Sequence, residues 1–206
     1  MGQYYRPITQ RNKTIKVYNR NVVYNGTPEY TLAKIMEHSW WKNDAVNAVC
    51  KDIYQHKTPT RLIWMGDYAD TFLESFNFPD WNGLKQEQLL ELMKKTWNCE
   101  GDNVNPPEFS LDGKYIVNHT KKCYLDCNEY YENSKMYYYD DIWCIHPLPI
   151  LTCIGNGQGG GDYTCPTDDS SFEYVGTWAW DKLTIEDTAP DYLKINIRFK
   201  ERGWEE

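Results

Sequence analysis

The segment from Gly155 to Asp162 has the most unusual composition in the chain, with five glycines in the seven positions 155–161. Glycine loses more conformational entropy on ordering than any other residue, so such a run needs a reason. One reason is a set of exposed backbone N–H groups that bind an anion, and another is close passage of a ligand or backbone. Two interpretations follow: a structural turn, or a ligand-binding loop made of Gly155, Asn156, Gly157, Gln158, Gly159, Gly160, Gly161 and Asp162.

The spacing Gly155-x-Gly157-x-x-Gly160 also matches the dinucleotide fingerprint. That fingerprint requires a helix directly after the glycines, so that the helix N-terminus faces the pyrophosphate. Here Pro166 follows within a segment that lacks helical periodicity, and the Lys-Ser/Thr pair of a P-loop is missing. We therefore expect neither a nicotinamide enzyme nor any other cofactor.

Asp67 and Asp70 follow a short apolar stretch and lie three residues apart. Two carboxylates at a strand end can hold a metal ion or position a water molecule, whereas Asp67 can equally close an Asx turn and Asp70 can cap a helix. Histidines 38, 119 and 146 are candidates for a general base, and each has a structural alternative. The candidate catalytic residues are therefore Asp67, Asp70, His38, His119 and His146. The cysteine spacing predicts no metal site, because no second pair of cysteines or histidines with the sequence spacing of metal ligands accompanies Cys123 and Cys127.

Trp178 and Trp180 alternate along a predicted strand, which would place both rings on one face. Such a pair can stack a nucleobase, although sheet packing is the commoner use. Lys121 and Lys122 follow His119 at a predicted hairpin tip, which is either a solvated turn or a small anion site.

Hydrophobic periodicity predicts an α+β fold, with a mixed or antiparallel sheet of about eight strands and about three helices packed on it. We expect a single domain over 1–206, with 98–113 as the candidate lobe boundary because it is rich in turn residues. The helices are expected over 29–39, 43–55 and 84–97, and a hairpin over 13–24 with its turn at 19–21. Further strands are expected over 61–65, 114–117, 122–126, 149–154, 172–178, 182–185 and 192–199.

The formal net charge is -8, from 30 acidic and 22 basic residues. Proteins that bind long nucleic acids usually carry a basic surplus, so we do not expect such a partner. The acidic surplus suits a basic protein partner, and a homo-oligomer is also compatible with it. No apolar run has the length of a membrane span or the position of a signal peptide, so a cytoplasmic protein without membrane contact is expected.

Seven short motifs carry a family resemblance. They are Met1–Tyr5 (MGQYY), Met36–Trp40 (MEHSW), Gly66–Asp70 (GDYAD), Asn118–Lys122 (NHTKK), His146–Pro149 (HPLP), Gly155–Tyr163 (GNGQGGGDY) and Val175–Asp181 (VGTWAWD). Together they resemble an uncharacterised protein family of bacteria and their phages. The resemblance covers roughly residues 1 to 185, and it implies a cytosolic protein in a bacterial or phage setting. It brings no activity, cofactor or catalytic residue.

Three functions remain open from the sequence. The first is a protein that binds and sequesters a phosphorylated small molecule such as a nucleotide signal, through the glycine loop, Lys121 and the tryptophans. The second is a metal- or water-using hydrolase built on Asp67, Asp70 and a motif histidine. The third is an acidic inhibitor that binds a host protein.

Overall fold

The computed structural model describes most of the chain, in ranges separated by short gaps. The described residues are 5–24, 27–30, 40–41, 43–66, 69, 85, 87–88, 90–92, 94, 102–104, 108–138, 141–154 and 173–199.

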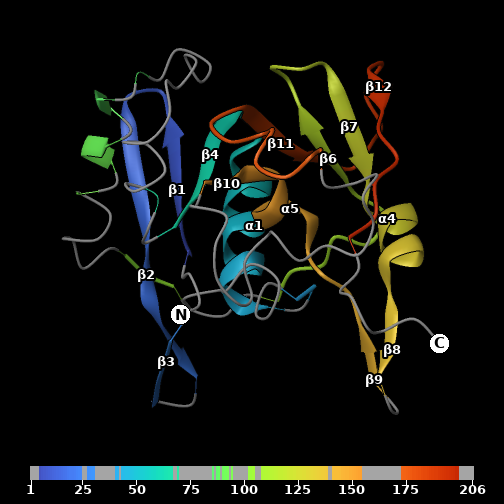
Figure 1. Ribbon diagram of the computed structural model, residues 1–206, viewed down its shortest axis with the longest axis horizontal. Coiled ribbons are helices and arrows are strands. Elements are labelled where there is room, and N and C mark those ends of the chain that lie inside the picture. The colour runs from blue at the N-terminus through green and yellow to red at the C-terminus, as the bar shows by residue number, and fades with distance from the viewer. Residues whose placement is uncertain are drawn as a thin grey trace.

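A mixed sheet organises these residues (Figure 1), in the strand order β12-β7-β6-β11-β4-β1-β2-β3, with β10 added beside β4 and β5 beside β2. Its strands are β1 (Tyr5–Arg11), β2 (Thr14–Tyr24), β3 (Thr27–Tyr30), β4 (Thr60–Gly66), β5 (Asp102–Val104), β6 (Tyr115–Asn118), β7 (Cys123–Asp126), β10 (Cys153–Ile154), β11 (Lys182–Glu186) and β12 (Leu193–Lys194). Three neighbouring pairs, β4–β10, β2–β5 and β7–β12, are parallel, and the other pairs are antiparallel. A separate hairpin pairs β8 (Met136–Tyr138) with β9 (Asp141–Trp143). The predicted α+β class with a mixed sheet is confirmed.

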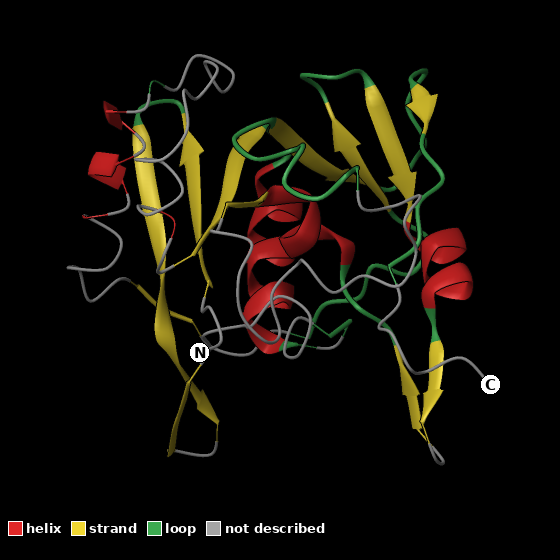
Figure 2. Ribbon diagram, viewed as in Figure 1, coloured by secondary structure: helices red, strands yellow, loops and turns green. Residues whose placement is uncertain are grey.

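The central helix α1 (Asp44–His56) confirms the helix predicted over 43–55. The Asn43 side chain accepts a hydrogen bond from the Val46 backbone N–H at 3.1 Å, which satisfies one free donor of the first turn. The apolar face of the helix, which includes Val49 and Ile53, is fully buried. Figure 2 shows α1 in the middle of the fold, between the strands β1 and β2 on one side and β6 and β7 on the other.

Two short helices complete this part of the fold. Helix α4 (Cys127–Ser134) begins at Asp126, whose carboxylate accepts two backbone N–H groups of the first turn. Helix α5 (Pro147–Thr152) occupies most of the range where a strand over 149–154 was expected, and only β10 at its end is extended. The strand prediction was wrong because Pro147 and the capping side chain of His146 favour a helical first turn.

The N-terminal hairpin was predicted with its turn in the wrong place. The turn lies at Asn12 and Lys13, with Asn12 at φ 54°, and β2 continues through the expected turn at 19–21. Asparagine tolerates positive φ at both places, so the residue type alone could not choose between them. The helix predicted over 29–39 is also wrong at its start, because residues 29 and 30 belong to the strand β3 (Thr27–Tyr30).

The C-terminal strands were overestimated. Residues 173–180 form turns where a strand over 172–178 was expected, and β12 covers only the beginning of the expected strand 192–199. The alternation that suggested the longer strand reflects burial, because Ile195, Ile197 and Phe199 are buried while the residues between them are exposed. The expected strands at 61–65, 114–117, 122–126 and 182–185 are confirmed as β4, β6, β7 and β11. Within the helix expected over 84–97, the described residues 87–88, 90–92 and 94 are helical, whereas Lys85 is not.

Two core clusters lie on the two faces of the sheet, and β4 contributes to both. Leu62 and Trp64 belong to the larger cluster, and Ile63 and Met65 belong to the smaller one. This alternation is what the two-residue period of a strand buried on both faces requires. None of the helices in the described ranges has the length and apolarity that a membrane-spanning helix needs.

Candidate functional site

The parallel strands β4 and β10 end side by side. Cys153 pairs with Trp64 and Ile154 with Met65, so the two strands run in the same direction up to their last residues. The Gly66-Asp67 motif continues β4, and the glycine run begins with Gly155 directly after β10. The two segments that the sequence singled out for chemistry therefore start from neighbouring strand ends. In sheets with parallel strands, the carboxyl ends are where ligands commonly bind.

A buried arginine lies one row before the end of β4. Arg6 on β1 pairs with Met65, and Met65 also pairs with Ile154, so all three side chains share one face. Arg6 is only 4% exposed. A guanidinium is costly to bury unless anionic or polar groups receive its hydrogen bonds. Arg6 therefore places a buried positive charge on the sheet face that ends at this edge.

One residue of the GDYAD motif, Ala69, lies on the same face of the sheet. Ala69 is fully buried, and it packs in the smaller core cluster with Met65 and Ile154. Since Asp67 and Asp70 flank Ala69 in the sequence, the motif is anchored on the face that carries Arg6. The side chains of Asp67 and Asp70 themselves lie outside the described residues. So do His38 and the whole predicted loop Gly155–Asp162.

The two tryptophans do not share a strand face, contrary to the sequence prediction. Trp178 is 1% exposed in the larger cluster, and Trp180 is 4% exposed in the smaller cluster. Their backbone N–H groups bond the carbonyls of Leu151 and Leu62, which ties the turn over 173–180 to α5 and β4. Both rings serve as core side chains in this arrangement.

The hairpin between β6 and β7 carries Lys121 and is attached to the same turn. The Asn118 side chain donates to the buried Asp181 carboxylate at 2.7 Å, and the Lys121 ammonium lies 3.9 Å from the same oxygen. Lys121 is about half exposed, with 44% of its side chain accessible. Part of its positive charge is therefore offset by Asp181 before any ligand is considered.

His119 belongs to a polar chain that crosses from β6 to β11. Its Nε2 lies 2.7 Å from the Thr184 hydroxyl, which donates to the Glu186 carboxylate at 2.6 Å. With the hydroxyl proton directed at Glu186, Thr184 accepts from the His119 Nε2–H. Burial is the main cause that lowers the pKa of His119, and it outweighs the opposing effect of Glu186. His119 is thus a neutral donor at neutral pH.

His146 is a structural residue in this fold. Its Nδ1 accepts the backbone N–H of Leu148 at 3.1 Å, and its Nε2 lies 3.5 Å from the Cys50 sulfur. The side chain is fully buried, and burial lowers its pKa to about 3. Both ring nitrogens are engaged, so His146 caps α5 and is not accessible to a substrate as a base.

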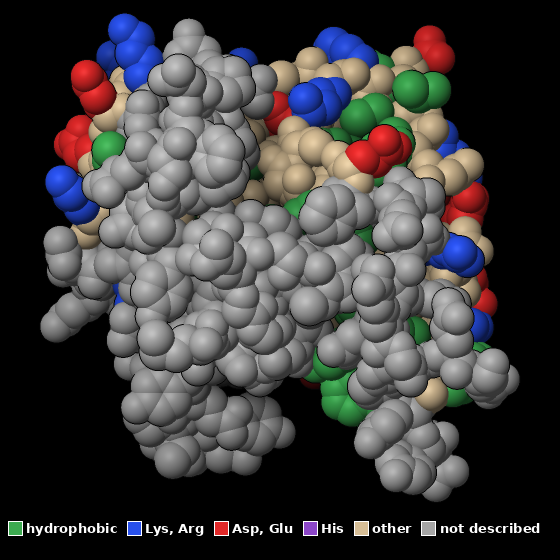
Figure 3. Space-filling view, viewed as in Figure 1, with side chains coloured by type: hydrophobic (Ala, Val, Ile, Leu, Met, Phe, Trp, Pro, Cys, Tyr) green, Lys and Arg blue, Asp and Glu red, His purple; other side chains and the backbone are tan. Residues whose placement is uncertain are grey.

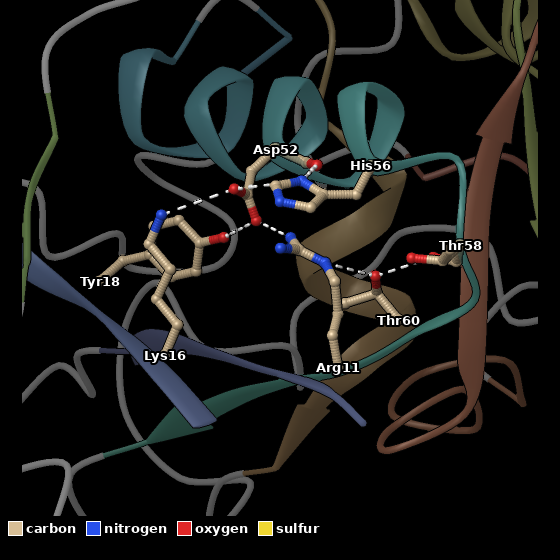
Figure 4. A network of polar contacts seen from close by, with 7 residues as sticks. All are labelled: Arg11, Lys16, Tyr18, Asp52, His56, Thr58 and Thr60. Carbon is tan, nitrogen blue, oxygen red and sulfur yellow. Dashed lines mark hydrogen bonds and ion pairs between the residues drawn. The ribbon is translucent and has the colours of Figure 1, made fainter. Parts of the chain in front are cut away.

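The sequence analysis missed a polar network around Asp52 (Figure 4). The Asp52 carboxylate forms an ion pair with Arg11, accepts the Tyr18 hydroxyl at 2.6 Å and lies 3.5 Å from the Lys16 ammonium. His56, one turn further along α1, lies 3.7 Å from the same carboxylate. The helical spacing of Asp52 and His56 was the available signal. The network holds the β1–β2 hairpin against α1 and so fixes the strand that carries Arg6.

The described residues contain no group of three or more His, Cys, Asp or Glu side chains that could hold a metal ion. Comparison of the chain with protein-family models, curated proteins and solved structures finds no match. The family resemblance of the seven motifs therefore stays a prediction.

Proposed function

We propose that the protein binds and sequesters a phosphorylated small molecule, such as a nucleotide signal, at the edge where β4 and β10 end. The observation that carries the proposal is the row Arg6–Met65–Ile154, which places a buried arginine on the same sheet face as the residue before the glycine run, two strands away from it. In the phage setting that the motifs imply, sequestration would remove a signal of the host.

Electrostatics supports a local anion site. The net charge of -8 repels a phosphate at long range, so binding requires donors placed close to it. A guanidinium offers paired donors that match two phosphate oxygens, and consecutive backbone N–H groups of a glycine-rich segment add further donors. Arg6 and the segment Gly155–Asp162 supply these two kinds of donor. Lys121 remains a secondary candidate, and the buried Trp178 and Trp180 are given no stacking role.

A nucleotide library screened by thermal denaturation tests the proposal. A ligand at about a hundred times its dissociation constant stabilises the folded state by roughly 2.7 kcal/mol, which raises the melting temperature. We expect at least one phosphorylated compound to give this rise and to be recovered intact. The rise should shrink at high salt, because ions screen phosphate contacts. A library without any stabilising compound would contradict the proposal.

Variants at Arg6 test whether its guanidinium receives the ligand. Arg6→Gln should weaken binding at least tenfold, since hydrogen bonds to charged groups contribute roughly 1.5–3 kcal/mol. Arg6→Lys should keep part of the affinity because it keeps the charge. The matched control is Arg198→Gln, which makes the same charge change at an exposed position. A folded Arg6→Gln variant with unchanged affinity would remove Arg6 from the site.

The glycine run is tested by Gly159→Ala combined with Gly160→Ala. We expect this double variant to fold with a modest loss of stability and to lose ligand binding. A double variant that does not fold would instead identify the run as a structural turn.

The hydrolase remains the second candidate, because the buried Ala69 anchors the Asp67–Asp70 motif on the face of Arg6. In that case the library hit is recovered as a cleaved product, and Asp67→Asn or Asp70→Asn leaves it intact while the protein stays folded. Metal analysis of the purified protein, with a melting curve in chelator, then distinguishes a metal-dependent hydrolase from a water-only one.

A further inference from the structure

Two hollows are lined by described residues that do not belong to the proposed phosphate site. The larger one has a volume of about 760 Å³, and its wall includes Trp41, Tyr131 and Phe109. The smaller one has a volume of about 260 Å³ and is also lined by Trp41 and Tyr131. Because these two rings belong to both walls, the hollows form one continuous surface.

Aromatic rings build most of this wall, and the fold fixes their positions. The rings of Trp41 and Tyr131 lie 5.2 Å apart, and those of Trp40 and Trp143 meet edge to face at 4.7 Å. The backbone N–H of Trp41, the residue after the MEHSW motif, donates to the Cys144 carbonyl at 2.8 Å, which joins this part of the chain to the segment before HPLP. These contacts, together with the packing of Trp41 on Tyr130 and His146, fix the positions of the rings before any ligand binds.

Every charged side chain among the described residues that line the hollows is acidic. Glu108 and Asp112 belong to the larger hollow, and Asp141 belongs to the smaller one. All three are exposed, and within the described ranges none of them forms an ion pair. Elsewhere the described surface in Figure 3 mixes Lys and Arg with Asp and Glu. Aromatic faces combined with carboxylates are the environment that a cation prefers.

The hairpin of β8 and β9 projects from the rest of the fold (Figure 1). Tyr137 and Ile142 are cross-strand partners, and they are 56% and 52% exposed. Ile142 also lines the smaller hollow. An apolar pair at the border of two acidic, aromatic hollows makes the surface larger than a single small cation needs. Its combination of aromatic and apolar groups is typical of protein interfaces.

We propose that this surface docks a basic segment of a partner protein, with arginine side chains in the two hollows. Arginine is favoured over lysine because its planar guanidinium stacks on aromatic rings and bonds carboxylates in pairs. The carboxylates of Glu108, Asp112 and Asp141, which form no ion pair within the described ranges, provide the complementary charge. The described residues that line the hollows do not include those proposed for the phosphate site, so each proposal is tested independently of the other.

Titration with a synthetic peptide tests the docking surface. The probe is an acetylated, amidated peptide of alternating glycine and arginine, and the matched control replaces each arginine with citrulline, its neutral isostere. Binding is followed by isothermal titration calorimetry and by tryptophan fluorescence. We expect the arginine peptide to bind at least tenfold more tightly than the citrulline peptide, as stacked and paired guanidinium groups require. Equal affinity for the two peptides, or no binding of either, would overturn the proposal.

Charge-matched variants locate the site. The double variant Glu108→Gln, Asp112→Asn should weaken binding of the arginine peptide about tenfold. The control variant Glu173→Gln, Asp191→Asn makes the same charge change at exposed positions outside the hollows and should have little effect on binding. Equal weakening in both double variants would show that only net charge matters, which overturns the site. Free arginine amide that binds as tightly as the peptide would also overturn it, since a small cation would then be sufficient.

Discussion

Gly176 lies against the backbone of Cys153, so closely that a side chain at this position has no room. A Cβ atom built on Gly176 would come within 2.7 Å of the Cys153 carbonyl oxygen. Cys153 is the first residue of β10, the strand that leads into the glycine run. The approach of Gly176 thus helps to hold the candidate phosphate site in place.

The variant Gly176→Ala should destabilise the protein more than Gly113→Ala. Both glycines have a positive φ, which costs an alanine about 1–2 kcal/mol, but Gly113 has no atom within 4 Å of its virtual Cβ. The added overlap with backbone at Gly176 should cost about 1–3 kcal/mol more. Urea unfolding of both variants measures this difference. Equal losses of unfolding free energy in the two variants would mean that the backbone near Gly176 shifts to accommodate the added Cβ at no measurable cost.

The hydrogen bond between Tyr18 and Asp52 should contribute measurably to stability. Tyr18→Phe removes only the hydroxyl, and we expect a loss of about 1 kcal/mol because Arg11 and Lys16 still neutralise Asp52. A double-mutant cycle with Asp52→Asn measures the coupling directly. Tyr137→Phe, at an exposed position, is the control and should change the unfolding free energy by less than about 0.5 kcal/mol. A coupling energy near zero between Tyr18 and Asp52 would show that their hydrogen bond does not stabilise the β1–β2 hairpin against α1.

The elements that could be predicted from sequence are those in which local preference and burial agree. Helix α1 has a capping Asn43 and a fully apolar face, and β4 is a short apolar run bounded by Pro59 and Gly66. The failures occur where tertiary contacts decide between local alternatives. The alternation of residue types after β12 correctly predicted that Ile195 and Ile197 are buried. It did not predict that this segment lacks a strand assignment, because burial alone does not provide a hydrogen-bonded partner strand.

The candidate site was predictable only in part, for a related reason. The composition identified Asp67 and the glycine run, and P-loop or dinucleotide spacing could be excluded from the residues that follow. The two segments start close together because β4 pairs with β10, and the paired residues are about ninety positions apart in the sequence. Hydrophobic periodicity predicts individual strands but does not predict which distant strands pair. Arg6 was missed because an arginine in a strand is usually exposed, and only the sheet register shows that it is buried.

The described cysteines should resist alkylation in the native protein. Burial raises the pKa of Cys123 to about 11 and that of Cys127 and Cys144 to about 12, and it raises the pKa of Cys50 well above its usual range. The reactive thiolate is therefore scarce, and the sulfurs are shielded. After native treatment with iodoacetamide at pH 8, peptide mapping should find these positions unmodified, whereas the same treatment in urea should modify all of them. Rapid native labelling of Cys50 would contradict its burial against His146.

Stability should depend on pH through His146. In the folded protein burial lowers the pKa of His146 to about 3, whereas the unfolded chain has the ordinary value of 6.5. Above pH 6.5 both states are neutral, so the folded state has its full stability. As the pH falls from 6.5 toward 3, the unfolded state takes up a proton that the folded state does not accept. The unfolding free energy therefore decreases by about 1.4 kcal/mol per pH unit in this window.

The variant His146→Asn isolates this contribution, because asparagine can cap a helix but does not titrate. The variant should be less stable at pH 7, since it loses the ring that contacts Trp41 and Cys50. Its deficit relative to the unchanged protein should then shrink by about 2 kcal/mol between pH 7 and pH 5, because only the unchanged protein has the His146 penalty. Urea unfolding at the two pH values measures the deficit. A deficit that stays constant with pH would show that His146 accepts a proton in the folded state.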